Sequence, residues 1–127
     1  MNILPGTFVD LKAARGFRSI GGLEFELPRQ DLQQSQAYQI GQTVDWGVRS
    51  ESIKIVEDST PDQKTFDATV VIVEPHGATT EVIVEVLGHQ LHMTLPEPHR
   101  PQRGDQIRIK FDLKHLHLFE ASTGRAL

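Results

Sequence analysis

The stretch Gly104–Gly124, GDQIRIKFDLKHLHLFEASTG, has a clear strand pattern. It opens with a Gly-Asp turn, after which Ile107, Ile109 and Phe111 alternate with basic residues. Alternation with a period of two is typical of a strand with one buried face. A second turn at Asp112 is followed by another apolar run, LHLF. The pattern predicts a final pair of strands that closes a barrel.

Similar signals recur along the chain. Two glycines at 21–22 precede Leu23–Leu27, in which leucine and phenylalanine alternate with glutamate, and this pattern predicts a hairpin with a half-buried strand. The region Phe66–Leu95 is rich in β-branched residues and contains a predicted hairpin turn at Gly88-His89. Pro5-Gly6 is interpreted as a turn pair. Polar loops are expected over Pro28–Gln42, Glu57–Lys64 and Pro96–Pro101. In total the sequence predicts roughly eight to ten short strands, and this number indicates an all-β barrel or sandwich.

Composition narrows the class of protein. A chain of 127 residues forms one domain or two small interlocked halves, and it contains no cysteine for a disulfide or a thiolate metal site. The formal net charge of −4 argues against a sequence-independent nucleic-acid binder, so single-stranded nucleic acid is the weakest alternative partner. No apolar run is long enough to span a bilayer, and the first residues lack a signal-peptide pattern. We expect a cytoplasmic protein.

Four segments resemble, in the same order, a known family. They are MNILPG at residues 1–6, GVRSESI at 47–53, VEPHGAT at 73–79 and the stretch 103–124. They are similar to the C-terminal regulatory domain in the ATP-binding subunits of carbohydrate-importing ABC transporters of the maltose and glycerol-phosphate type. Ser50, Ser52, Leu113 and Glu120 depart from the family pattern. The resemblance covers essentially the whole chain.

The resemblance implies an OB-like/TOBE β-barrel and a single regulatory domain over residues 1–127, separated from an upstream nucleotide-binding domain. The phosphate-binding pattern G-x-x-x-x-G-K-[ST] is absent, so this chain is not expected to be an enzyme. ATP and Mg²⁺ are expected only in the missing nucleotide-binding domain, and this chain is expected to hold no cofactor.

The implied partners are the chain's own nucleotide-binding domain, a second ATPase subunit, the permease subunits, and a regulatory protein or metabolite. The implied location is the cytoplasmic face of the inner membrane. The alternative function is a stand-alone OB-like domain that binds a small oxyanion or an oligosaccharide.

Arg49 and Glu51 are candidate interdomain or partner contacts. They lie two residues apart and share a face if this segment is a strand. The resemblance places the segment near the join with the ATPase domain. The alternative interpretation is a local salt bridge, which contributes little beyond local order.

His76, Gly77 and Thr79 form a candidate ligand loop between two predicted strands. Backbone N–H groups of such loops hold ligands in OB-type barrels. The alternative is a tight turn that simply requires Gly77.

Six histidines raise the question of a metal site. The pairs His115/His117 and His89/His92 each lack a third ligand at a diagnostic spacing, so no metal site is predicted. Trp46 is expected in the core, because one aromatic residue cannot make an extended base-binding track. Asp105, Asp112 and Glu120 form no nucleophile–base set, and no catalytic residues are predicted.

Overall fold

The protein is described by a computed structural model that covers residues 1–12, 14–28, 33, 39–56, 64–96, 101–113 and 117–127. Within these ranges it is an all-β protein, as the sequence predicts. One short 3₁₀ helix, η1, spans Ser50–Ser52. The ten strands are β1 (Asn2–Leu11), β2 (Ala14–Ser19), β3 (Glu24–Glu26), β4 (Thr43–Val48), β5 (Ile53–Ile55), β6 (Phe66–Pro75), β7 (Thr79–Val86), β8 (His89–Pro96), β9 (Gln106–Phe111) and β10 (His117–Glu120). The described part of the chain holds no helix with the length and apolarity that a membrane span requires.

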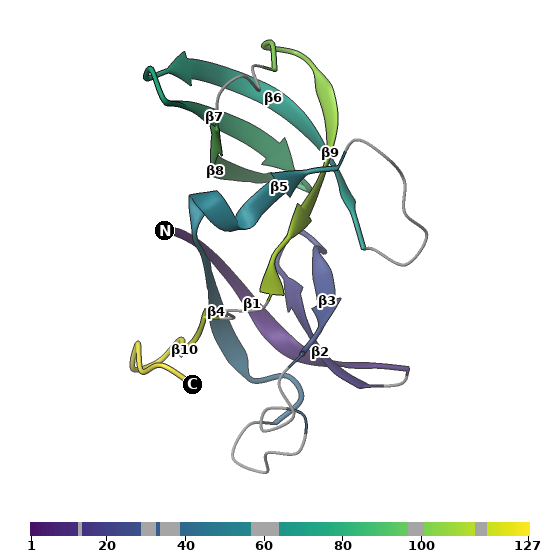
Figure 1. Ribbon diagram of the computed structural model, residues 1–127. Coiled ribbons are helices and arrows are strands. Elements are labelled where there is room, and N and C mark those ends of the chain that lie inside the picture. Colours follow the sequence, from purple (N-terminus) through teal and green to yellow (C-terminus); the bar gives the residue numbers. More distant parts are fainter. Residues whose placement is uncertain (13, 29–32, 34–38, 57–63, 97–100, 114–116) are drawn as a thin grey trace. The chain divides into compact units, whose positions relative to one another are not determined.

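The strands form two five-stranded sheets, with the order β10-β4-β1-β2-β3 in sheet A and β5-β9-β6-β7-β8 in sheet B (Figure 1). Contacts divide the chain into two compact units that alternate along the sequence. The first unit comprises Met1–Asn2 and Val48–Asp112, and the second comprises Ile3–Gly47 and Leu113–Leu127. The expectation of one regulatory domain over residues 1–127 stays a prediction.

The first unit contains sheet B, which curls until its two edge strands, β5 and β8, contact each other. Antiparallel pairing of β6, β7 and β8 in two consecutive hairpins makes up most of this sheet. A β-bulge between Val70 and Ile72 shifts the register of β6 against β7, and such bulges bend a strand. Alternate side chains of β7 and β8, Val82 and Met93 among them, are buried. The result is a near-barrel with an apolar interior.

The second unit contains sheet A and an aromatic cluster. The ring centroids of Phe25 and Trp46 lie 4.7 Å apart, and those of Phe17 and Trp46 lie 5.9 Å apart. Trp46 is only 1% exposed, which confirms its predicted place in the core. Aromatic pairs at these separations stabilise a core beyond the area they bury.

The predicted hairpin after Gly21-Gly22 is confirmed. Strands β2 and β3 pair antiparallel, and Gly22 takes a φ of +94°, a region that favours glycine. In the second arm Leu23, Phe25 and Leu27 are buried, while Glu24 and Glu26 lie on the other face. The alternation of apolar and acidic residues over Leu23–Leu27 was sufficient to predict which side chains of this arm are buried.

Three local predictions were wrong. Pro5-Gly6 is not a turn, because β1 continues through it and a side chain at Gly6 would run into the Arg18 carbonyl and the Phe17 ring. The turn between β7 and β8 lies at Leu87-Gly88, one residue earlier than predicted, with Val86 opposite His89. Both turn residues have positive φ.

The third correction concerns the last two strands. The predicted final pair does not form, because β9 pairs with β5 and β6 in sheet B while β10 pairs with β4 in sheet A. Asp112 donates its N–H to the Ser52 carbonyl and ends the part of the chain that belongs to the first unit. The predicted loops over 28–42, 57–64 and 96–101 lie largely outside the described residues.

Candidate functional site

The candidate contact residues Arg49 and Glu51 lie at a turn between two strands. Strand β4 ends at Val48, η1 follows, and β5 begins at Ile53. Arg49 is extended, with φ −75° and ψ 146°, and its carbonyl accepts a 3.0 Å bond from the Ser52 N–H. The chain between the two residues is therefore a 3₁₀ turn, and the strand geometry that would place them on one face is not formed.

A cluster of hydroxyl and carboxylate groups attaches η1 to sheet B. The Thr94 hydroxyl oxygen lies 2.9 Å from the Ser50 hydroxyl oxygen and 3.1 Å from each carboxylate oxygen of Glu81. Glu81 and Thr94 are directly opposite each other in the β7–β8 ladder. The turn is thus fixed to two strands that are themselves paired over eight residues.

The side-chain amide of Asn2 fixes the entry into the turn. Its Nδ2 donates to the carbonyls of Val48 at 3.2 Å and His92 at 3.0 Å, and its Oδ1 accepts the His92 N–H at 2.8 Å. His92 lies on β8, an edge strand of sheet B. Asn2 therefore satisfies the free backbone groups of this edge as a neighbouring strand would do.

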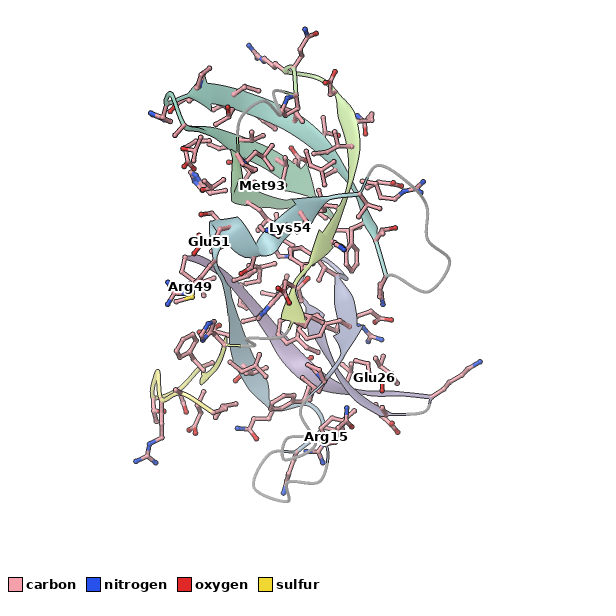
Figure 2. All side chains as sticks on the ribbon, in the orientation of Figure 1. Arg15, Glu26, Arg49, Glu51, Lys54 and Met93 are labelled. Atoms are coloured by element: carbon pink, nitrogen blue, oxygen red, sulfur yellow. The ribbon has the colours of Figure 1, made fainter. Side chains whose placement is uncertain are left out.

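The two charged side chains are exposed beside this rigid support (Figure 2). The pKa of Glu51 is lowered, first because the carboxylate accepts its own backbone N–H, then because it accepts the Ser50 hydroxyl at 3.2 Å, and to a smaller extent by the Arg49 charge. Among the described residues, Arg49 forms no ion pair within 4 Å with Glu51 or any other carboxylate. The turn therefore presents one basic and one acidic side chain, and the lowered pKa keeps Glu51 ionised near neutral pH.

The candidate ligand loop is an exposed hairpin turn between β6 and β7. The His76 N–H donates to the Thr79 carbonyl at 2.8 Å, and Gly77 has a φ of +85°. His76 Nε2 lies 3.7 Å from Glu74 Oε2, and both side chains are more than half exposed. Three hollows of the described surface, at Pro5–Thr7, at Gln106–Arg108 and at Val71–Val73, have none of the loop residues His76, Gly77 or Thr79 in their lining. Thr79 precedes Glu81 by two residues, and Glu81 contacts Thr94 beside η1, so the loop and η1 both lie toward the Thr79 end of β7. No described bond joins the loop to Arg49 or Glu51.

The histidine pairs do not converge on a metal site. His89 and His92 lie on β8, half-buried and exposed respectively, whereas His115 is outside the described residues and His117 lies on β10. In the described ranges no three histidine or acidic side chains are grouped so that they could hold a metal ion.

Three residues that the sequence analysis missed hold the structure around η1: Asn2, Glu81 and Thr94. Gln33 acts in the second unit as Asn2 does in the first. Its amide accepts the Arg15 N–H at 2.7 Å and donates to the carbonyls of Arg15 at 2.7 Å and Leu27 at 2.8 Å. Asn2 belongs to the segment MNILPG that carries the resemblance, but no sequence signal assigns it or Gln33 a role. The backbone groups that each amide binds are brought to it only by the fold.

The sequence and the fold were compared with those of known proteins. A model of the TOBE domain matches residues 46–119. The alpha-glucoside transport ATP-binding protein AglK of Rhizobium meliloti is 31% identical over 124 residues, which cover 96% of this chain and 32% of AglK. The trehalose/maltose import ATP-binding protein MalK of Thermococcus litoralis is 27% identical over 97% of this chain and 34% of its own length. The chain spans about a third of the length of these relatives.

The fold is similar to that of a solved protein as well. The crystal structure of the cytoplasmic molybdate-binding protein ModG, with molybdate bound, superposes with a TM-score of 0.71 over 92% of this chain and 94% of that one. The sequences are 14% identical, so this similarity concerns the fold. The family match covers more than half of the chain and agrees with the resemblance drawn from the four sequence segments. The chain belongs to the TOBE domain family and resembles the C-terminal region of sugar-importing ABC transporter ATPases.

Proposed function

We propose that this chain is the regulatory and dimer-contact domain of the ATP-binding subunit of a sugar-importing ABC transporter, and that it performs no catalysis itself. The observation that carries the proposal is the alignment of 96% of the chain with about a third of AglK, an alpha-glucoside transport ATP-binding protein. ATP and Mg²⁺ would be bound in the nucleotide-binding domain, outside these residues.

The η1 turn is the contact surface in this proposal. Regulation between two sites is a coupling free energy, so it requires contacts that differ between two states of the assembly. Arg49 and Glu51 suit this role because they are opposite charges on a turn that Asn2 and Thr94 fix to β8. Exposed charges at an interface chiefly determine which partner binds and how fast it binds.

The partners follow from the same assignment. The domain would contact its own nucleotide-binding domain and a second ATPase subunit, and through the full protein the permease subunits at the cytoplasmic face of the inner membrane. A regulatory protein or a metabolite would act by changing these contacts. No nucleic acid is expected.

In the test, the chain is expressed with an affinity tag in the cells from which it comes and is purified under mild conditions together with its bound partners. The proposal predicts that the chain is recovered with an ABC nucleotide-binding domain, whether on the same polypeptide or on another. Charge reversal by Arg49→Glu should lower recovery of a separate partner, or change the ATPase rate of a fused one, by about tenfold, which corresponds to about 1.4 kcal/mol.

Lys12→Glu is the matched control, because Lys12 is also exposed and makes no described ion pair. Recovery without any nucleotide-binding domain would contradict the assignment. Equal effects of the two reversals would leave the assignment to a transporter intact and contradict the role of η1.

The second candidate is the binding of a small oxyanion or an oligosaccharide by the loop at His76, Gly77 and Thr79. Its support is the similarity of fold to ModG, which is a molybdate-binding protein. Thermal-shift measurements with molybdate, sulfate and maltose test it directly. A rise in Tm with one of these that is lost in His76→Ala would favour this function, and no rise with any would exclude it.

A further inference from the structure

The outer face of sheet A carries a hollow that no part of the proposed function uses. It has a volume of about 360 Å³ and lies within the second unit, between β1, β2, β4 and Ala121, which follows β10. Sites for small molecules commonly enclose about 300–1,000 Å³. The hollow is therefore large enough for a small organic ligand.

The walls of this hollow are largely apolar. Pro5, Ile20 and Ala121 line it together with Thr7. Ile20 is 79% exposed, the highest value among the large apolar side chains that are described. Apolar surface exposed to water at a concave site favours a ligand with an aliphatic part.

The charges at the hollow are not balanced. Arg18 also lines it, but the Nε of Arg18 lies 2.8 Å from Glu24 Oε2, so this cation is already paired. Asp45 is half-buried, and within the described ranges its side chain has neither a hydrogen-bond nor an ion-pair partner. A buried or half-buried carboxylate is stabilised by a cation nearby. The hollow therefore favours a positively charged ligand and disfavours an anion.

An aromatic residue lies beside the free carboxylate. Phe119 on β10 is directly opposite Asp45 on β4, and both are half-buried. Directly opposite residues of an antiparallel pair share a face, with Cβ atoms about 4.5–5.5 Å apart. A cation that binds Asp45 is thus within reach of the aromatic ring, and cations are attracted to the faces of such rings.

We propose that this hollow binds a small aliphatic ammonium compound. Its ammonium group pairs with Asp45 next to Phe119, and its alkyl chain lies against Pro5 and Ile20. This inference is independent of the transporter assignment, since it concerns sheet A and requires no other subunit.

The test is a titration of the ¹⁵N-labelled chain with n-hexylammonium, followed by NMR. Hexanol and hexanoate serve as probes of the same length without the positive charge. We expect shifts at Thr7, Asp45 and Ala121 with hexylammonium, weaker binding of hexanol by about tenfold, and no binding of hexanoate. Asp45→Asn should weaken hexylammonium binding about tenfold and bring it to the level of hexanol.

Two variants separate a specific site from a general effect. Asp10→Asn removes the same charge from an exposed position of β1 that does not line the hollow, and it should bind as the unmodified chain does. Ala121→Phe should abolish binding, because it fills the hollow from an exposed position. Equal binding of hexanol and hexylammonium, an Asp45→Asn variant that binds normally, or shifts confined to other residues would each overturn the proposal. Binding only of lysine-containing peptides would overturn it in favour of a protein partner.

Discussion

Asn2 and His92 are ninety residues apart in sequence, yet the Asn2 side-chain amide pairs with both the N–H and the C=O of His92, at 2.8 and 3.0 Å. The same amide nitrogen also reaches the Val48 carbonyl at 3.2 Å. Three bonds from one small side chain close the edge of β8 and fix the strand that leads into η1. The amide is required for this, because it provides an acceptor and two donors.

Replacement of Asn2 should weaken the fold. Asn2→Ala leaves the His92 N–H and two carbonyls without these partners, and the expected loss is about 1–3 kcal/mol in the free energy of unfolding. Asn2→Asp should cost more than Asn2→Ala, since a carboxylate would face the carbonyls of Val48 and His92. Urea unfolding measures both, and Gln90→Ala, at an exposed position of β8, is the control that should change little. An unchanged midpoint for Asn2→Ala would contradict this account.

Gln33 should matter in the second unit for the same reason. Gln33→Ala removes three bonds to the backbone of Arg15 and Leu27, and we expect a loss of about 1–3 kcal/mol. Gln39→Ala is the matched control, because the Gln39 side chain is exposed and makes no described bond. Equal stability of the two variants would show that the Gln33 amide contributes nothing.

Leu87 offers a route to higher stability. It is the only described residue other than glycine with a positive φ, at 48°, and it precedes Gly88 in a two-residue hairpin turn. A left-handed conformation costs most residues about 1–2 kcal/mol, and Asn tolerates it. Leu87→Asn should therefore stabilise the chain by roughly 1 kcal/mol, seen as a higher urea midpoint. Leu87→Ala, which shortens the same exposed side chain without this tolerance, should give no gain, and equal gains would refute the backbone explanation.

Trp46 reports on the core of the second unit. It is the only tryptophan and is 1% exposed, so its fluorescence emission should be blue-shifted in the folded chain and red-shifted on unfolding. Trp46→Ala should destabilise the chain by about 3–5 kcal/mol because it leaves a cavity against Phe17 and Phe25. Trp46→Phe retains an aromatic ring and should lose less. A red-shifted emission in the native chain would contradict the buried position.

The charge of Glu51 gives a pH-dependent prediction. Its pKa in the folded chain lies below the ordinary value of 4.5. A depressed pKa contributes stability above the unfolded pKa, and this contribution is lost as the pH falls from about 4.5 through the folded pKa. Ser50→Ala removes one of the bonds that lower the pKa, so NMR titration of the Glu51 carboxyl should show a higher pKa in this variant. A pKa that does not move would exclude the hydroxyl as a cause.

The fold class and several strands could be predicted because their signals are local. Alternation at Leu23–Leu27, two glycines at a turn and the β-branched run from Phe66 each act within a few residues. The separation of β9 from β10 could not be predicted in this way. The apolar alternation in β9 and β10 shows that both are strands, but it does not show which sheet each strand joins. The same alternation is equally compatible with a hairpin of these two strands.

The candidate sites were predictable only in part. Arg49 and Glu51 were found by resemblance, but their geometry depends on η1 and on Thr94 of a distant strand. The hollow beside Asp45 gave no signal, since its residues come from four segments and only the register of β4 against β10 brings Phe119 opposite Asp45.

The alternation of the two units along the chain has a consequence for synthesis and folding. Strand β10 is translated after the whole of the first unit, yet it completes sheet A by pairing with β4, which is translated some seventy residues earlier. Pairing at such separation carries a large loop-closure entropy and slows folding. During translation, sheet B can be completed while sheet A still lacks its edge strand β10. The aromatic cluster around Trp46 is therefore completed last, when Leu118 of β10 pairs opposite Trp46.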